Sequence, residues 1–299
     1  APGIIAVQRS GDPWSNNSDF WIRGLSSFAG NTRPLVLIDG IERSINDIDP
    51  DEVASFSILK DAAASAVYGV RGANGVIMVE TKRGNIGKPK VSVRVEHALS
   101  QPVKKPDYVG SVKYLELINE MYAQEGKSPF VSDATLNNYR DQTDPELYPD
   151  INWWNTISKN HADNTRATLS VNGGSKTLRY ALVAGYYNEN GILVRDKSKE
   201  WDSSLKVDRY TVRSNVDINL TNSTVLRINI GGYLQSRNAP PGDITNKTVF
   251  YNAMRVPPYI HPAIYSDGRI PKVMYKENPW SALTQRGYEK LNHSNIEAL

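Results

Sequence analysis

The amino-acid sequence predicts a mainly β protein, in which a small mixed α/β domain precedes the first strands of a large antiparallel transmembrane β-barrel. From Val91 onward, apolar and polar residues alternate over long stretches, as they do in strands with two different faces. The connections between these stretches alternate between tight and long, which is typical of an up-and-down barrel. The mean hydropathy of −0.47 fits such strands, and no apolar run approaches the roughly 18 residues of a transmembrane helix.

The first 88 residues predict a compact domain of short elements. The turn pair Asp39-Gly40 closes an apolar strand, and Asp49 precedes a proline, so Asp49 is expected to cap a short helix. A longer, alanine-rich helix is expected to end at Gly69 in a left-handed conformation. The expected elements are strands at 35–38, 55–59 and 76–81, a short helix that starts at Pro50, and a helix at 62–68.

The composition changes between Gly84 and Lys90, so we expect a domain boundary there, with domains at 1–88 and 89–299. The second domain would hold the first five to six barrel strands and an amphipathic helix at 112–124. In its clearest strand, one face carries Tyr210, Val212, Ser214, Val216, Ile218 and Leu220, and the other carries Thr211, Arg213, Asn215, Asp217 and Asn219. Tight turns are expected near 173–176 and 221–224, and long loops at 100–164, 188–208 and 237–290.

Composition and motifs argue against several function classes. The 35 basic and 32 acidic residues form no long run of either sign, so no nucleic-acid partner is expected. The sequence has no cysteine and no recognisable catalytic motif, and its four histidines are far apart without ligand spacing. We therefore expect no catalytic residue, no metal, no cofactor and no enzyme.

Two short patterns in the first domain have a functional and a structural interpretation. The acidic run Asp47, Asp49, Asp51 and Glu52 imitates the start of a calcium loop, but it lacks the glycine and the closing glutamate of such loops. Helix capping explains it better. The glycine-rich stretch 71–75 could bind an anion, although a corner between a helix and a strand is the more frequent role of such a stretch.

Three stretches of the first domain resemble the plug of SusC-like (RagA/SusC) TonB-dependent outer-membrane transporters. They are Trp21-Ile22-Arg23-Gly24, then Pro34 through Gly40, and then the long stretch from Asp51 to Lys82. We interpret the shared residues as structural. They are Arg23, Gly24, Asp39, Gly40, Lys60, Asp61, Tyr68, Gly69, Arg71, Gly72, Asn74 and Gly75.

The resemblance implies energised import of oligomeric nutrients, glycans or peptides, across the bacterial outer membrane. The implied partners are a SusD-like surface lipoprotein, TonB with ExbB and ExbD, the oligosaccharide or peptide substrate and outer-membrane lipid. The plug would be accessible from the periplasm and the long loops would be extracellular. A plugged barrel of roughly 22 strands needs more residues than this chain offers, so we expect it to be part of a longer protein.

Aromatic side chains are the candidate substrate contacts, because sugar rings stack on aromatic faces. The candidates are Trp14, Phe20, Trp21, Trp153 and Trp154. Core packing is the alternative for the first three, and loop packing or contact with a lid protein is the alternative for the last two. Two other functions are alternatives for the whole chain: a passive surface receptor or adhesin barrel, and a soluble carbohydrate-binding β protein.

Overall fold

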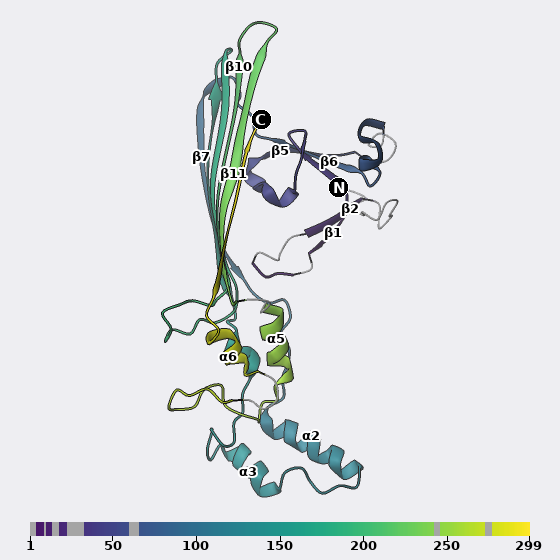
Figure 1. The fold of residues 1–299 in the computed structure, drawn as a ribbon, viewed down its shortest axis with the longest axis vertical. Coiled ribbons are helices and arrows are strands. Elements are labelled where there is room, and N and C mark those ends of the chain that lie inside the picture. The colour runs from purple at the N-terminus through teal and green to yellow at the C-terminus, as the bar shows by residue number, and fades with distance from the viewer. Residues whose placement is uncertain are drawn as a thin grey trace.

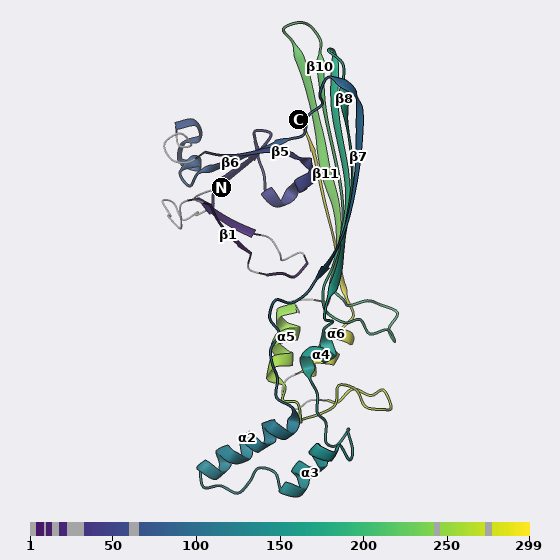
Figure 2. The same ribbon diagram turned by 180° about the vertical axis from the view of Figure 1, so that it is seen from behind.

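The computed structural model describes residues 4–8, 10–13, 18–22, 33–59, 66–241, 246–272 and 277–299. Within these ranges the strands form three sheets, of two, four and six strands. The two smaller sheets lie beside one face of the six-stranded sheet, and the helices α2 to α6 gather beyond one end of its strands (Figures 1 and 2). We call the described residues from 4 to 81 the N-terminal unit, and the six-stranded sheet the wall.

The N-terminal unit is built on a four-stranded mixed sheet with the order β4-β3-β6-β5. Asp39 and Gly40 adopt positive φ angles of 50° and 86°, which lets the chain turn back directly after β3, as predicted. β3 then pairs in parallel with β6 over a core that includes Ile38, Ile77 and Val79. The strands are β1 (Ile4–Gln8), β2 (Ser18–Ile22), β3 (Leu35–Ile38), β4 (Ile41–Glu42), β5 (Val53–Leu59) and β6 (Val76–Thr81).

Short 3-10 turns connect these strands. The carboxylate of Asp49 accepts a hydrogen bond from the backbone N–H of Asp51 at 2.9 Å, which confirms the predicted cap. The described part of the alanine-rich helix ends at Tyr68, and Gly69 follows with the expected positive φ, 58°, and begins a further 3-10 turn. Most of the helix expected at 62–68 lies outside the described residues. The turns are η1 (Ile45–Asp47), η2 (Pro50–Glu52) and η3 (Gly69–Gly72).

The wall is an antiparallel meander in which each strand pairs with the next along the chain. Its strands are β7 (Gly87–Ser100), β8 (Ala162–Gly174), β9 (Leu178–Asn190), β10 (Lys206–Asn219), β11 (Val225–Ala239) and β12 (Glu289–Ala298). Tight turns join β8 to β9 and β10 to β11, and longer connections join the other neighbours. The predicted alternation of short and long connections is therefore confirmed.

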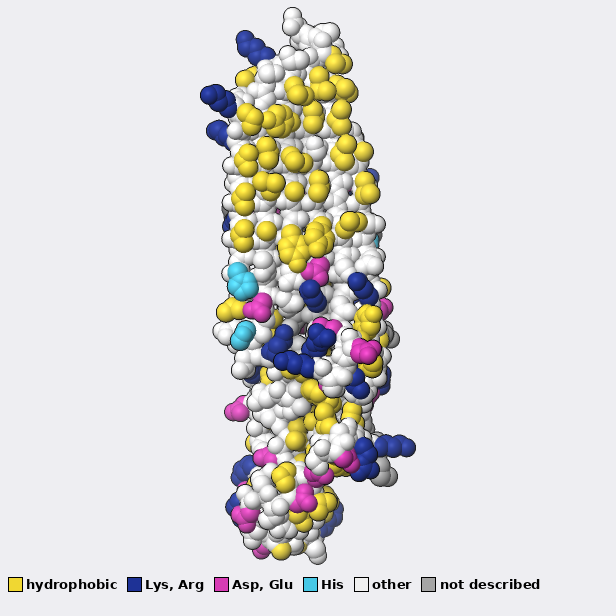
Figure 3. Space-filling view, turned by 90° about the vertical axis from the view of Figure 1, so that its left-hand side faces the viewer, with side chains coloured by type: hydrophobic (Ala, Val, Ile, Leu, Met, Phe, Trp, Pro, Cys, Tyr) yellow, Lys and Arg dark blue, Asp and Glu magenta, His cyan; other side chains and the backbone are white. Residues whose placement is uncertain are grey.

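The two faces of the wall are inverted relative to a water-soluble sheet. On β10, Val212 is 52% exposed, whereas its neighbours Arg213 and Asn215 are 4% and 2% exposed. The outward apolar side chains of all the strands merge into one continuous band (Figure 3). The polar side chains, such as Arg213 and Asn215, are buried on the opposite face. The N-terminal unit covers that face of the sheet (Figures 1 and 2). This pattern is that of a barrel wall with lipid outside and a polar lumen inside.

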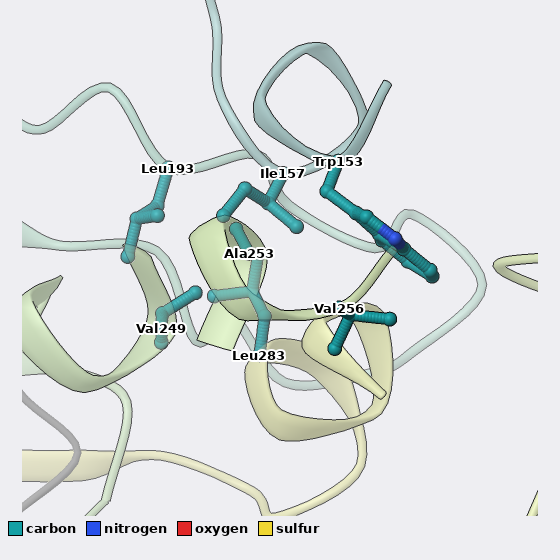
Figure 4. Close-up of a cluster of buried hydrophobic side chains, with 7 residues drawn as sticks. All are labelled: Trp153, Ile157, Leu193, Val249, Ala253, Val256 and Leu283. Atoms are coloured by element: carbon teal, nitrogen blue, oxygen red, sulfur yellow. The ribbon is translucent and has the colours of Figure 1, made fainter. Parts of the chain in front are cut away.

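The described parts of the connections at one end of the wall carry five helices with small cores of their own. One core joins α4, α5 and α6 through Ile157, Val249 and Leu283, all fully buried (Figure 4). A second core packs α2 against α3. The helices are α2 (Ser111–Gln124), which matches the predicted amphipathic helix, α3 (Asp133–Asp141), α4 (Trp153–Ile157), α5 (Asn246–Arg255) and α6 (Pro279–Thr284). Within the described ranges, no helix is both long and apolar enough to cross a membrane.

The link between the two parts of the chain runs close against the wall. At Gly84, an added Cβ would lie 2.2 Å from the backbone nitrogen of Tyr180 on β9. Only glycine fits such an approach of two backbones without a shift. The link is therefore fixed to the wall just before β7 begins.

Candidate functional site

The main contact between the N-terminal unit and the wall is made by a row of carboxylates. Asp47, Asp49, Asp51 and Glu52 lie in and between the turns η1 and η2, and we call these four residues the acidic ridge. The carboxylates of the ridge reach side chains of different strands, so the ridge contacts β7, β8, β10 and β11.

The most deeply buried contact of the ridge is an ion pair with β10. The Nε atom of Arg213 donates to the Glu52 carboxylate at 2.6 Å, and the two side chains are 5% and 3% exposed. The same guanidinium donates to Glu297 on β12 at 2.9 Å, and Glu297 in turn pairs with Arg43 of the N-terminal unit. Two charges from each side are thus linked in one buried network.

Burial decides the protonation behaviour of this network. Loss of solvent raises the pKa of the Glu52 carboxyl above its ordinary value, and the hydrogen bond from Arg213 only partly opposes the shift. Desolvation likewise lowers the pKa of Arg43, helped by repulsion from Arg213. The charges of this network are stabilised by one another instead of by water. Removal of one member therefore leaves its partner buried and unpaired.

The other members of the ridge bind polar side chains that point inward from the wall. Arg166 on β8 reaches Asp49 at 3.3 Å, and Thr168 two residues further donates to Asp51 at 2.7 Å. Arg94 on β7 lies 3.5 Å from Asp51. On the other side, the guanidinium of Arg209 donates to the backbone oxygens of Asn46 and Asp47, each at 2.8 Å, and packs over the Tyr233 ring.

A second contact connects the end of β6 to the wall through neutral groups. The Asp39 carboxylate accepts from the backbone N–H and the hydroxyl of Thr81, at 3.0 and 2.7 Å. Asn215 on β10 then donates to the Thr81 hydroxyl at 2.6 Å and to the Lys82 carbonyl at 2.8 Å. Asp39, predicted as a structural residue, thus holds the strand end that the wall binds.

The remaining predicted structural residues lie in the corners of the N-terminal unit. Tyr68 packs on the core at Leu35, and Arg71 forms an ion pair with Glu42. A Cβ added at Gly75, where φ is 88°, would lie 2.6 Å from a side-chain atom of Ile22, so this glycine allows close packing. Gly40, Gly69, Gly72 and Asn74 lie in the turns around them. The predictions for Arg23, Gly24, Lys60 and Asp61 fall outside the described residues.

The candidate aromatic residues are dispersed over the molecule. Trp21 is 8% exposed, and Trp153 is 3% exposed in the core of Figure 4, so both side chains pack in the interior. Phe20 borders a cavity of about 350 Å³ in the N-terminal unit. Trp154 stacks on Phe250 with ring centroids 4.6 Å apart at a second cavity beside the wall. Trp14 lies outside the described residues.

The functional role of the acidic ridge was missed at the level of sequence, because capping already accounted for Asp49. The available signal was the inner face of β10, where Arg213, Asn215 and Asp217 require polar partners on a covering domain. Within the described ranges, no group of three or more His, Cys, Asp or Glu side chains could hold a metal ion.

A family model described as the TonB-dependent receptor plug domain matches residues 1–76. TonB-dependent receptor P26 of Formosa agariphila is 31% identical over 252 residues, which cover 81% of this chain and 23% of that relative. TonB-dependent receptor SusC of Bacteroides thetaiotaomicron is 27% identical over 216 residues, covering 69% of this chain and 20% of that relative. The chain belongs to the SusC-like family of TonB-dependent receptors.

Solved structures agree with this assignment at the level of the fold. The RagAB peptide transporter matches with a TM-score of 0.72 at 21% identity, over 94% of this chain and 34% of that one. The RagAB peptide importer in its open-open state matches with a TM-score of 0.71 at 20% identity, over 94% of this chain and 33% of that one. The chain therefore spans about a fifth to a quarter of the curated SusC-like relatives and a third of the solved ones.

Membership of the SusC-like family confirms several predictions. The N-terminal unit is the plug, and the wall is part of an antiparallel barrel. TonB-dependent receptors are outer-membrane proteins, which confirms the outer membrane as the predicted location, and they are not enzymes. The acidic ridge is thus a contact between a plug and the inner surface of a barrel wall.

The buried state of Glu52 gives a pH-dependent prediction for the plug contact. Because the pKa of Glu52 is raised in the docked state, docking is more favourable when Glu52 is protonated, and this part of the docking free energy is lost as pH rises from about 4.5 through the raised value. Glu52→Gln should remove that dependence while Arg213 keeps Glu297 as partner. The measurement is the hydrogen-exchange protection of amides 43–52 in the full-length protein, after correction for intrinsic exchange rates.

Glu80→Gln is the matched control for this prediction, because Glu80 is an exposed plug carboxylate that accepts a hydrogen bond from Ser55 within the plug. It should leave the pH profile of the wild type unchanged. A Glu52→Gln profile that keeps the wild-type slope would show that another group titrates at the interface.

Proposed function

We propose that this chain forms the plug and the first barrel strands of a transporter that imports oligomeric nutrients across the outer membrane with energy from TonB. The plug would comprise residues 1–88 and the barrel strands would lie within 89–299. ExbB and ExbD would energise TonB, and a SusD-like surface lipoprotein would cover the loops carrying α2 to α6 on the extracellular side. The substrate would be a glycan or a peptide held between plug, wall and loops, with Phe20 and Trp154 as aromatic contacts.

The observation that carries the proposal is the polar contact between the acidic ridge and the inner face of the wall. A domain held by hydrogen bonds and ion pairs can exchange those partners for water when it moves, since the net contribution of each hydrogen bond is only about 0.5–1.5 kcal/mol. An apolar interface of the same size would resist separation more strongly. The plug therefore stays docked on the wall at rest and separates from it when force is applied.

In this mechanism no covalent bond of the substrate changes. Bound substrate and the force from TonB each favour the open arrangement, and the plug contacts favour the closed one. Opening requires the ridge to leave the wall or to rearrange against it. Glu52, Asp49 and Asp51 would lose Arg213, Arg166 and Thr168 in that step.

A reversible lock across the ridge tests the proposal in the full-length protein. Asp51→Cys with Thr168→Cys joins two short side chains that already touch at 2.7 Å, and this chain contributes no other cysteine. The oxidised variant should bind substrate at the cell surface but stop importing it, and a reducing agent should restore import. Ser55→Cys with Glu80→Cys, a pair within the plug, is the control that should import when oxidised.

Import by the oxidised Asp51–Thr168 lock at the wild-type rate would contradict the proposal. So would import that continues undiminished in cells without TonB, which would indicate a passive receptor.

A further inference from the structure

His261 lies in the interior of the helical region beyond the end of the wall. It is 6% exposed, and its ring lies against Trp153 with the ring centroids 5.2 Å apart. Trp153 belongs to the core that joins α4, α5 and α6 (Figure 4). The imidazole of His261 is therefore shielded from the water that would stabilise its charged form.

The surroundings of the two ring nitrogens of His261 fit a neutral imidazole. Nδ1 lies 2.8 Å from the carbonyl oxygen of Pro262, and a carbonyl can only accept, so the proton of the neutral ring is assigned to Nδ1. Nε2 is buried and has no hydrogen-bond partner among the residues that the structure describes. Protonation would turn this acceptor into a donor, and would thus add a charge and an unpaired N–H to the core.

The charged groups of the neighbouring segments are engaged away from His261. The helices α4 and α6 carry no charged residue, and Arg255 at the end of α5 lies over the ring of Tyr251. Burial raises the pKa of Tyr259, two residues before His261, so this phenol stays neutral. The carboxylates of these segments have other partners: Asp150 accepts from the backbone N–H of Ser111, Glu146 accepts from that of Ser266, and Glu277 pairs with Arg286.

We infer that His261 is a pH-sensitive switch that keeps three connections of the wall packed together at neutral pH and lets them separate in acid. Each connection contributes to the core beside His261: Trp153 comes from the β7–β8 connection, Leu193 from β9–β10 and Leu283 from β11–β12. Separation of the connections would expose the imidazole, where water can solvate its charge. The inference goes beyond the proposed function, because it concerns protons and requires neither substrate nor TonB.

The direction of the pH effect follows from the pKa of His261 in the two arrangements. In separated connections the ring has its ordinary pKa of 6.5, and in the packed core burial lowers the pKa, which the Pro262 carbonyl only partly opposes. The separated arrangement therefore binds the proton more readily. The stabilising contribution of neutral His261 is fully present above about pH 6.5 and is lost as pH falls through this value toward the lowered one, by at most about tenfold per pH unit.

Hydrogen exchange of the full-length protein in detergent tests the switch at about pH 7.5 and about pH 5.5, after correction for intrinsic exchange rates. The amides to follow lie in α4, α5 and α6. Their protection should fall about three- to tenfold at the lower pH in the wild type. His261→Asn cannot titrate, and its amide can still donate to Pro262, so it should remove this dependence. His261→Phe, which keeps a ring against Trp153, should remove it as well.

His161→Gln is the matched control, because His161 is an exposed histidine at the same end of the wall. This variant should keep the pH dependence of the wild type. Equal protection of the wild type at both pH values would overturn the inference, and so would an undiminished pH dependence in either variant of His261. A protein that shows the switch but does not import would contradict the proposed function and leave this inference in place.

Discussion

Replacing Arg213 with alanine is expected to release the plug from the wall in the full-length protein. The substitution leaves two buried carboxylates, Glu52 and Glu297, without their shared cation, and breaking a buried pair in this way costs about 3–5 kcal/mol. The closed population should fall at least about a hundredfold relative to open forms. Ion conductance across planar bilayers measures this directly, because a displaced plug leaves the barrel lumen unobstructed.

Arg227→Ala is the matched control for this result. Arg227 lies on the neighbouring strand β11 and approaches Asp217 only to 4.0 Å, with its side chain 68% exposed. Exposed pairs contribute about 1 kcal/mol or less, so its loss should not change the conductance. Arg213→Lys should be intermediate, because an ammonium keeps the charge but not the planar fork that serves two carboxylates. If the Arg213→Ala protein conducted ions no better than the wild type, the buried network would not be what holds the plug on the wall.

The second large effect is expected on the outer face of the wall. Val212→Arg places a charge in the apolar band of Figure 3, where an arginine costs about 2–4 kcal/mol near the bilayer midplane. The fraction of full-length protein that folds into phospholipid vesicles, titrated with urea, should fall accordingly. Leu147→Arg is the control, since Leu147 is 68% exposed but lies in a connection between α3 and α4. Equal tolerance of both substitutions would mean that the band faces water.

The wall was largely predictable from sequence, because its strands obey a local rule. Alternation on β10 identified both faces, and the tight turns fixed where the strands reverse. The contacts of the acidic ridge were not predictable from sequence. The carboxylate of Asp49 accepts a hydrogen bond from the local turn and another from the distant Arg166. Because the cap already explains an aspartate at this position, the sequence pattern does not indicate the long-range contact with Arg166.

The adjacent tryptophans show a second limit of sequence reasoning. Trp153 and Trp154 share the same neighbours along the chain and were predicted together. The short helix α4 separates consecutive side chains by about 100° around its axis. Trp153 therefore enters the core, and Trp154 faces Phe250 and the cavity. The packing of α5 against α4 determines that Trp153 is buried and Trp154 borders the cavity. That contact joins residues far apart in sequence.

The contacts of the acidic ridge also constrain the order in which this protein can fold. Glu52 and Asp47 are synthesised long before their partners, which follow 161 residues later at Arg213 and 186 residues later at Tyr233. Contacts of such long range form slowly, because the chain entropy of closing the loop must be overcome first. The carboxylates of the ridge therefore lack these partners until β10 and β11 are in place. Docking of the plug becomes a late step of biogenesis, after the arginines of the wall have come together.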